Sequence, residues 1–183
     1  GEWLCANTKL VTGHDGKLVV RLSDKDTNIR LNSDSEIVLR PTAFGGDVSL
    51  SAGIMHFLSS VKTQFSVHTR LLSAGIDGTE AIVHVSAADG VLVAVREGLV
   101  TTRQGELQLP VSKRGVAYAA PNAPVRLVAA ADVQSLPPVF RSYVIDFDGQ
   151  VDWAIYYPPA LLRAAGTDAT AANLLAAGRT SEA

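Results

Sequence analysis

Four histidines are the side chains of this sequence best suited to chemistry near neutral pH, because imidazole can bind metal ions or transfer protons. They are His14, His56, His68 and His84. A metal site needs three or four converging ligands, and His68 and His84 fall on segments that we expect to be adjacent strands. No cysteine pair or carboxylate accompanies them at ligand spacing, so we interpret all four as surface or strand-face histidines. We predict no metal and no cofactor.

Thr79 and Glu80 form a second candidate, as a nucleophile and an acid. A threonine hydroxyl needs an adjacent base and an oxyanion site, and neither can be recognised. The sequence also has no nucleophile elbow, phosphate-binding loop or dinucleotide fingerprint. We therefore predict a structural role, in which Gly78 permits an unusual backbone angle and Thr79 and Glu80 satisfy nearby backbone groups. Glu97 and Gly98 receive the same interpretation, and no catalytic residue is predicted.

Asp146-Phe147-Asp148-Gly149, together with Asp152, has some features of a calcium-binding loop. The segment lacks a third ligand at the correct step and the bidentate glutamate that closes such loops. We interpret it as a turn between two strands, which we place at Tyr143–Asp146 and Gln150–Tyr156.

Composition limits the classes of function. The chain has 183 residues, a net charge of −2 and a single cysteine, Cys5. This length suits one domain with an appendage, and the charge gives no reason to expect nucleic acid as a partner. Cys5 is interpreted as a half-buried core residue. No apolar run reaches the roughly 18 residues that a membrane helix needs, so no span is expected. The chain begins at Gly1, in a segment that we expect to be ordered, and shows no signal peptide, so we expect a fragment of a longer exported protein.

The stretch from Phe65 to Gly98 must position the histidines and glutamates discussed above. Residues 80–86 and 91–96 alternate with a period of two, yet both faces are largely apolar, which is typical of strands buried between layers. Asp89-Gly90 between them predicts a tight hairpin turn.

Further short strands are predicted on both sides of this stretch, with turn signals every 8 to 12 residues. We place a break after Glu36–Arg40, because Pro41 cannot donate to a ladder. This spacing predicts an all-β protein, an antiparallel β-sandwich or a short β-solenoid-like body. The expected strands are Lys17–Leu22, Thr27–Asn32, Glu36–Arg40, Val48–Leu50, Gly53–Leu58, Glu106–Val111, Gly115–Ala119 and Val125–Ala130.

Three motifs in this region resemble the FecR domain, the periplasmic β-rich domain of bacterial signalling regulators. They are Phe65-Ser66-Val67-His68-Thr69, Gly78-Thr79-Glu80-Ala81 and Val95-Arg96-Glu97-Gly98-Leu99-Val100, which follow the family patterns F-x-V-x-T, G-T-E-F and V-x-E-G-x-V. Ala81 stands where the family usually has phenylalanine, and Arg70 where a proline often follows the threonine. The resemblance implies a FecR-like β domain over residues 1–120.

The C-terminal third carries a further part of this resemblance. Residues 121–159 contain several prolines and are predicted to form an extended connector that packs on the β domain. Val151–Pro159 resembles the segment that follows the FecR domain in a subgroup continuing into tetratricopeptide repeats. The aromatic and proline residues expected to hold this connector in place are Trp153, Tyr156, Tyr157 and Pro158. Residues 160–183 are predicted to be a short helical tail that begins such a repeat.

Three functions remain open at this point. The resemblance implies a non-enzymatic periplasmic module for protein–protein interaction and signalling, within the regulation of iron transport. It also implies that this module is the scaffold part of a larger repeat protein. Its partners would be other envelope proteins, bound through a sheet edge or a loop rim. The alternative is a module that binds glycans or small ligands of the cell envelope, with Trp153 and Tyr156 as stacking surfaces. A hydrolase is the third hypothesis and would require a concave pocket with a strongly shifted titratable group.

Overall fold

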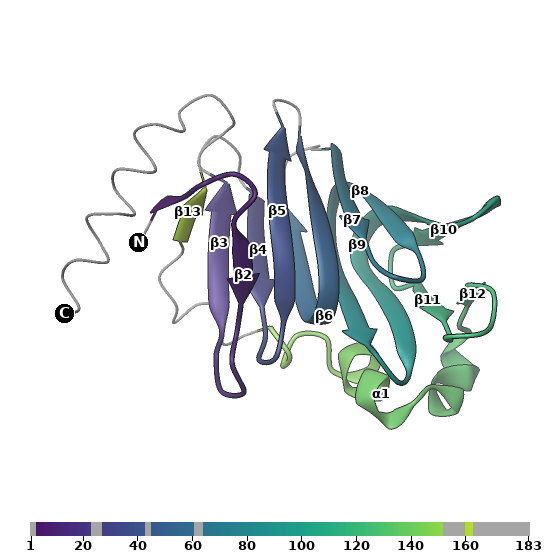
Figure 1. Ribbon diagram of the computed structural model, residues 1–183. Helices are drawn as coiled ribbons and strands as arrows, with labels where there is room; N and C mark the ends of the chain where they lie inside the picture. The colour runs from purple at the N-terminus through teal and green to yellow at the C-terminus, as the bar shows by residue number, and fades with distance from the viewer. Residues whose placement is uncertain (1–2, 23–26, 43–44, 61–63, 152–159, 163–183) are drawn as a thin grey trace.

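The computed structural model describes residues 3–22, 27–42, 45–60, 64–151 and 160–162 (Figure 1). Thirteen strands and two short helices occupy these ranges. The first seven strands are β1 (Trp3–Leu4), β2 (Lys9–Val11), β3 (Leu18–Leu22), β4 (Thr27–Leu31), β5 (Glu36–Thr42), β6 (Gly45–Ser59) and β7 (Gln64–His68). The remaining elements are β8 (Ser73–Ser86), β9 (Gly90–Gln104), β10 (Leu107–Ser112), β11 (Val116–Ala119), β12 (Arg126–Leu127), the 3₁₀ helix η1 (Ala130–Ser135), α1 (Pro138–Ile145) and β13 (Ala160–Leu162).

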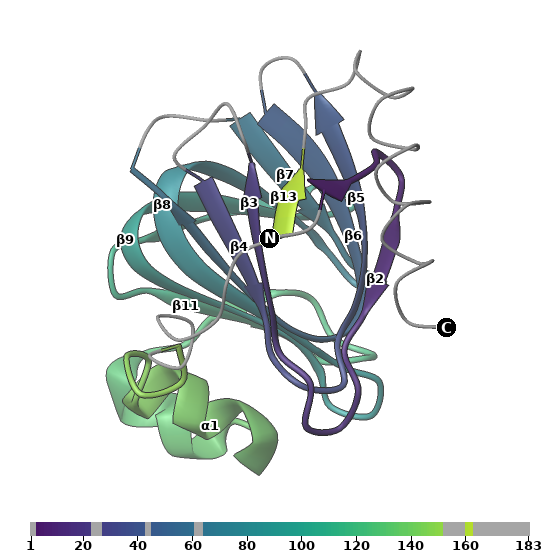
Figure 2. The same ribbon diagram turned by 90° about the vertical axis from the view of Figure 1, so that its left-hand side faces the viewer.

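One continuous sheet folds into two facing layers because β6, β8 and β9 are long enough to take part in both. The first half of β6 pairs with β5 and β7, and its second half pairs with β4 and β8. The second half of β8 and the first half of β9 continue the layer of β4 towards β11. Figure 2 shows β8 and β9 on one side of the molecule and β2 and β5 on the other. The predicted all-β class is confirmed; most pairings are antiparallel, whereas β6–β7, β13–β3 and β1–β13 are parallel.

Two glycines mark the place where β8 and β9 pass from one layer to the other. Gly78 and Gly98 have positive φ angles of 55° and 81°, and the pairing register shifts between Asp77 and Glu80. A β-carbon on Gly98 would lie 3.0 Å from the Gly78 carbonyl oxygen and would collide with the Thr79 methyl group. The unusual backbone predicted at Gly78 is therefore present, and it forms part of a bulge inside two long strands.

Side chains alternate along these strands between two apolar environments, as the sequence pattern predicts. Val83 and Val93 belong to the main core between the layers, whereas Ile82 and Leu92 are equally buried on the outer face of the same layer. The tight turn at Asp89-Gly90 is confirmed, since β8 ends at Ser86 and Gly90 has a φ of 110°.

The outer face is buried because η1 and α1 cover it. Phe140 of α1 is fully buried against a second apolar cluster that includes Leu92 and Tyr118. The predicted extended connector is corrected here, since it contains two helices, and the predicted strand Tyr143–Asp146 is instead the last turn of α1 and its C-cap. Proline is compatible with this helix because Pro138 lies in its first turn, where no N–H is needed.

Three smaller predictions are also corrected. Strand β5 continues through Pro41 to Thr42, and the expected strands Val48–Leu50 and Gly53–Leu58 are parts of the single strand β6. A positive φ of 83° at Gly53 lets the chain bend there without interruption. Ala160–Leu162 forms β13 in place of the start of a helix, because it pairs with β1 and β3. The rest of the predicted tail, and Trp153, Tyr156, Tyr157 and Pro158, lie outside the described residues.

Candidate functional site

Polar side chains gather on the outer face of the sheet, beside the C-terminal end of α1. Register places Arg30 of β4 opposite His56 of β6, and His56 opposite Ile82 of β8. Arg96 comes from β9 on the same face, two residues after Ala94. The sheet therefore supplies one row of side chains from four neighbouring strands.

Within this row His56, Glu80 and Arg96 form a connected polar network that ends at Asp148. His56 is only 2% exposed, and its Nε2 lies 3.1 Å from Glu80 Oε1. Arg96 Nε lies 3.5 Å from Glu80 Oε2, and the Arg96 guanidinium also pairs with Asp148. Four side chains thus connect β6, β8 and β9 to the turn that follows α1.

Burial determines the charge state of this network. Desolvation lowers the pKa of His56 and outweighs the opposing hydrogen bond to Glu80, while that hydrogen bond lowers the pKa of Glu80. At neutral pH a neutral imidazole therefore donates its Nε2 proton to an ionised carboxylate. Its Nδ1 atom accepts from Arg30 Nη1 at 3.5 Å.

His84 lies nearby on β8 in a more apolar environment. Its ring makes edge contacts with Phe140 and Tyr143 of α1, at centroid distances of 4.8 and 5.0 Å. Burial lowers the pKa of His84 to about 4, although the Asp89 carboxylate opposes this shift. Its Nδ1 atom is buried and has no hydrogen-bond partner among the described residues. A neutral His84 therefore forms part of the surface on which α1 packs.

These contacts hold α1 against the sheet. Glu80 is occupied by His56 and Arg96 and cannot easily act as a free base. In the part of the chain that the structure describes, no three histidine, cysteine or acidic side chains converge in a metal-binding group. Phe147 adds an edge contact to His56 and lies beneath the Arg96 guanidinium.

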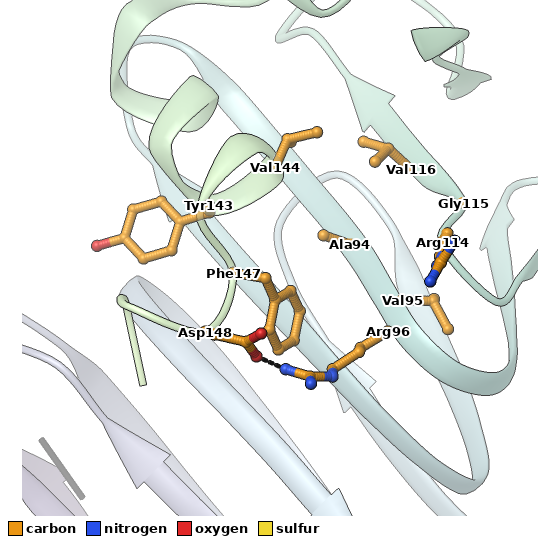
Figure 3. Close-up of a pocket in the computed structure, with 10 residues that line it drawn as sticks. All are labelled: Ala94, Val95, Arg96, Arg114, Gly115, Val116, Tyr143, Val144, Phe147 and Asp148. Atoms are coloured by element: carbon orange, nitrogen blue, oxygen red, sulfur yellow. Dashed lines mark ion pairs between the residues drawn. The ribbon is translucent and has the colours of Figure 1, made fainter. Parts of the chain in front are cut away.

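A pocket of about 330 Å³ opens beside this network, between α1 and the strands β9 and β11 (Figure 3). Val144 and Val116 face each other across it, and Ala94 lies at its floor. Arg96 and Arg114 supply cationic groups at its wall. The pocket is mostly apolar, with its charged groups on one side.

The structure does not bring the four histidines and Glu97 together in one site. His14 and His68 lie on the surface, where they pair with Asp34 and Asp47. Among the described residues they share no partner with the buried His56 and His84. Glu97 pairs with Lys113 on the surface.

Two predicted roles need correction. Thr79 is buried, and its hydroxyl oxygen has no partner among the described residues, so it satisfies no backbone group there. Its methyl group instead fills the space that Gly98 leaves open. Glu80 binds two side chains in place of backbone groups. The turn predicted after Asp146 is present, and the Gly149 amide donates to the Asp146 carboxylate at 3.2 Å.

Strand β10 offers a second kind of surface, a free sheet edge. It pairs with β9 over six residues and, among the described residues, forms a ladder with no other strand, although β12 lies close to it (Figure 1). Pro110 has no N–H, so we infer that positions 108, 110 and 112 direct their backbone groups outward, and positions 107, 109 and 111 bond to β9. The exposed edge then carries the amides of Gln108 and Ser112 and the carbonyl groups of Gln108 and Pro110, since the Ser112 carbonyl already accepts from the Gly115 amide.

The chain is similar to one protein family and to two solved structures. The family described as FecR protein matches residues 8–101. Two crystal structures of a candidate anti-sigma factor from Parabacteroides distasonis ATCC 8503 are similar in fold, with TM-scores of 0.59 and 0.57 and identities of 20% and 21%. Each comparison covers 66% of this chain and 58% of the other, so the similarity spans little more than half of those proteins. No curated protein matches the chain. No helix among the described residues is long and apolar enough to cross a membrane.

Proposed function

The chain belongs to the FecR protein family, and we propose that it is a regulatory module that binds another protein of the bacterial envelope without catalysing a reaction. The similarity in fold to a candidate anti-sigma factor supports a role in signalling. The proposed location is the periplasm, and a larger repeat protein that continues this chain is part of the same proposal.

The observation that carries this proposal is the free edge of β10. Leu107 is 39% exposed beside it, and the neighbouring Leu99 of β9 is 47% exposed. An incoming strand would pair with the outward groups of Gln108 and Pro110 and with the Ser112 amide, while one of its side chains contacts Leu107. Pro110 removes one N–H donor at the centre of the edge, and this limits nonspecific strand pairing. The edge then offers amide donors at positions 108 and 112 but none at position 110.

A glycan-binding module has less support. Sugars stack on free aromatic faces, yet in the pocket of Figure 3 the Phe147 ring lies beneath Arg96 and against His56. The Tyr143 ring packs against His84. Both rings are already in contact with neighbouring side chains, and Trp153 and Tyr156 lie outside the described residues.

An affinity experiment with envelope extract tests the proposed function. The immobilised domain is compared with Gln108→Pro, which removes an outward amide, and with Gln108→Ala, which keeps it. We expect at least one envelope protein to be retained by the unchanged domain and by Gln108→Ala, with at least a tenfold loss on Gln108→Pro. If every retained protein binds all three forms equally, the edge is not the binding surface and the proposal fails.

A further inference from the structure

A second hollow lies beside the pocket of Figure 3 and continues it along β11. It measures about 370 Å³ and lies between β11, η1 and the C-terminal end of α1. The two hollows share Arg114, Val116 and Val144. They therefore form one elongated groove, which we call the α1 groove, with Arg114 at the boundary between its two halves.

The lining of each half is chiefly apolar. The first half is lined by Ala94, Val116 and Val144, and the second adds Val128 and Ile145. Ile145, the last residue of α1, is 66% exposed. Burial of its side chain therefore contributes little to the free energy of folding. Each half is large enough for at least one large apolar side chain.

Arg114 brings a positive charge that its surroundings leave uncompensated. The neighbouring cations are paired, Arg96 with Glu80 and Asp148 and Lys113 with Glu97. Among the described residues Arg114 has no ion pair and no side-chain hydrogen bond. A carboxylate placed in the groove would complete its interactions.

The backbone also holds Arg114 in an uncommon conformation. Its φ angle is 62°, in a tight turn closed by a 2.7 Å hydrogen bond from the Gly115 amide to the Ser112 carbonyl. A residue other than glycine seldom adopts this left-handed conformation, because its β-carbon comes too close to the following carbonyl oxygen. Strain of this kind gathers at binding sites, where a side chain must be presented in a fixed direction.

We propose that the α1 groove binds a peptide segment of a partner protein that carries an acidic side chain between two large apolar side chains. The acidic group would pair with Arg114, and the apolar groups would fill the two halves. An elongated groove with two apolar halves fits a polypeptide better than a single small ligand. One uncompensated arginine is too little for an anionic membrane surface, which attracts clusters of basic residues. The groove lies on the sheet face. Its Arg114 turn adjoins Ser112 at the end of β10, but no residue of β10 lines the groove, so either site can fail without the other.

Selection from a phage-displayed library of random dodecapeptides on the intact chain tests this assignment. Enriched peptides are synthesised with a fluorescent label, and their affinity is measured by fluorescence polarisation. We expect an acidic residue flanked by large apolar residues in the enriched sequences. Amide shifts in NMR spectra on titration with the peptide should cluster at β11 and the end of α1.

Matched variants separate the groove from the general surface. Arg114→Gly removes the charge and relieves the positive φ, while Lys113→Ala removes the neighbouring charge. Ile145→Ser alters the groove, and Val139→Ser changes an exposed apolar residue of the same helix that does not line it. We expect at least tenfold weaker binding for Arg114→Gly and Ile145→Ser, and less than a twofold change for both controls and for Gln108→Pro.

Four results would overturn the proposal. One is an enriched peptide set without acidic residues, and another is Arg114→Gly binding within twofold of the unchanged chain. The third is sedimentation with vesicles of phosphatidylglycerol that depends on Arg114 while no peptide binds. The fourth is a dimer of the chain that Ile145→Ser dissociates, because the groove would then be an interface between copies.

Discussion

His56 Nε2 lies 3.1 Å from Glu80 Oε1, in a pair that joins β6 to β8 beside the end of α1. The histidine is fully buried, and the Glu80 side chain is 18% exposed. Removal of the carboxylate leaves a buried imidazole N–H and one side of Arg96 without their acceptor. Glu80→Ala should therefore lower the free energy of unfolding by about 2–3 kcal/mol, as measured by urea denaturation at pH 7.5.

Glu97→Ala is the matched control for that change, since Glu97 pairs with Lys113 on the surface. Its effect on stability should be too small to measure, because exposed ion pairs contribute little. Equal effects of the two substitutions would contradict a structural role for the His56–Glu80 pair.

Gly98→Ala should be among the most damaging single-methyl additions in the chain. The new β-carbon would require a φ of 81° and would collide with Thr79 at the bulge between the layers. We expect a loss of about 3 kcal/mol or more. Gly105→Ala provides the control, because Gly105 also has a positive φ but no atom within 4 Å of an added β-carbon. Its loss should be about 1 kcal/mol; a Gly98→Ala effect no larger than this would argue against tight packing at the bulge.

The bulge shows which part of the fold the sequence could predict. The Asp89-Gly90 hairpin and the two apolar faces of β8 and β9 follow from local rules of turn geometry and alternation. The same rules suggest that Gly78 and Gly98 end short strands. In the structure each strand continues past its glycine into the other layer, because the two glycines and Thr79 fit together across the ladder. That fit depends on a pairing between distant residues, which spacing along one strand does not reveal.

Acid should destabilise the protein through His84. Burial holds its folded pKa at about 4, below the ordinary value of 6.5, so the unfolded chain takes up a proton first as the pH falls. The stability associated with a neutral His84 is complete above pH 6.5, decreases between pH 6.5 and 4, and levels off below that. The loss should be on the order of 3 kcal/mol, and the lowered pKa of His56 acts in the same direction.

Urea denaturation at a series of pH values between 8 and 4 measures this dependence. His84→Phe keeps an aromatic ring against Phe140 and Tyr143 but cannot take up a proton. We expect this variant to lose less stability than the unchanged chain over that range. An identical slope for both proteins would show that His84 is not the group responsible.

Phe140 should anchor α1 to the sheet. It is fully buried and contacts the His84 ring, so Phe140→Ala should cost about 3–5 kcal/mol or release the helix locally. Val139→Ala, at an exposed position of the same helix, should stay within about 0.5 kcal/mol of the unchanged chain. Hydrogen exchange distinguishes local release from global unfolding, and unchanged protection of the α1 amides in Phe140→Ala would contradict the anchoring role.

The candidate site was harder to predict than the strands. A signal for α1 is present, since Phe140, Tyr143, Val144 and Phe147 have the i, i+3, i+4, i+7 spacing of an amphipathic helix. The prolines before it favoured an extended interpretation, although proline is common in the first turn of a helix. The network of His56, Glu80, Arg96 and Asp148 arises from strand register and from the position of α1. Both are tertiary features that no local motif encodes.

A photo-crosslinking experiment in cells shows whether the β10 edge binds an envelope protein. The crosslinking amino acid p-benzoylphenylalanine replaces Gln108 in cells that produce the full-length protein, and replaces the exposed Arg21 of β3 in a control. We expect a defined crosslinked product with one envelope protein from position 108 that position 21 does not give. The absence of any product from position 108, or the same products from both positions, would contradict it.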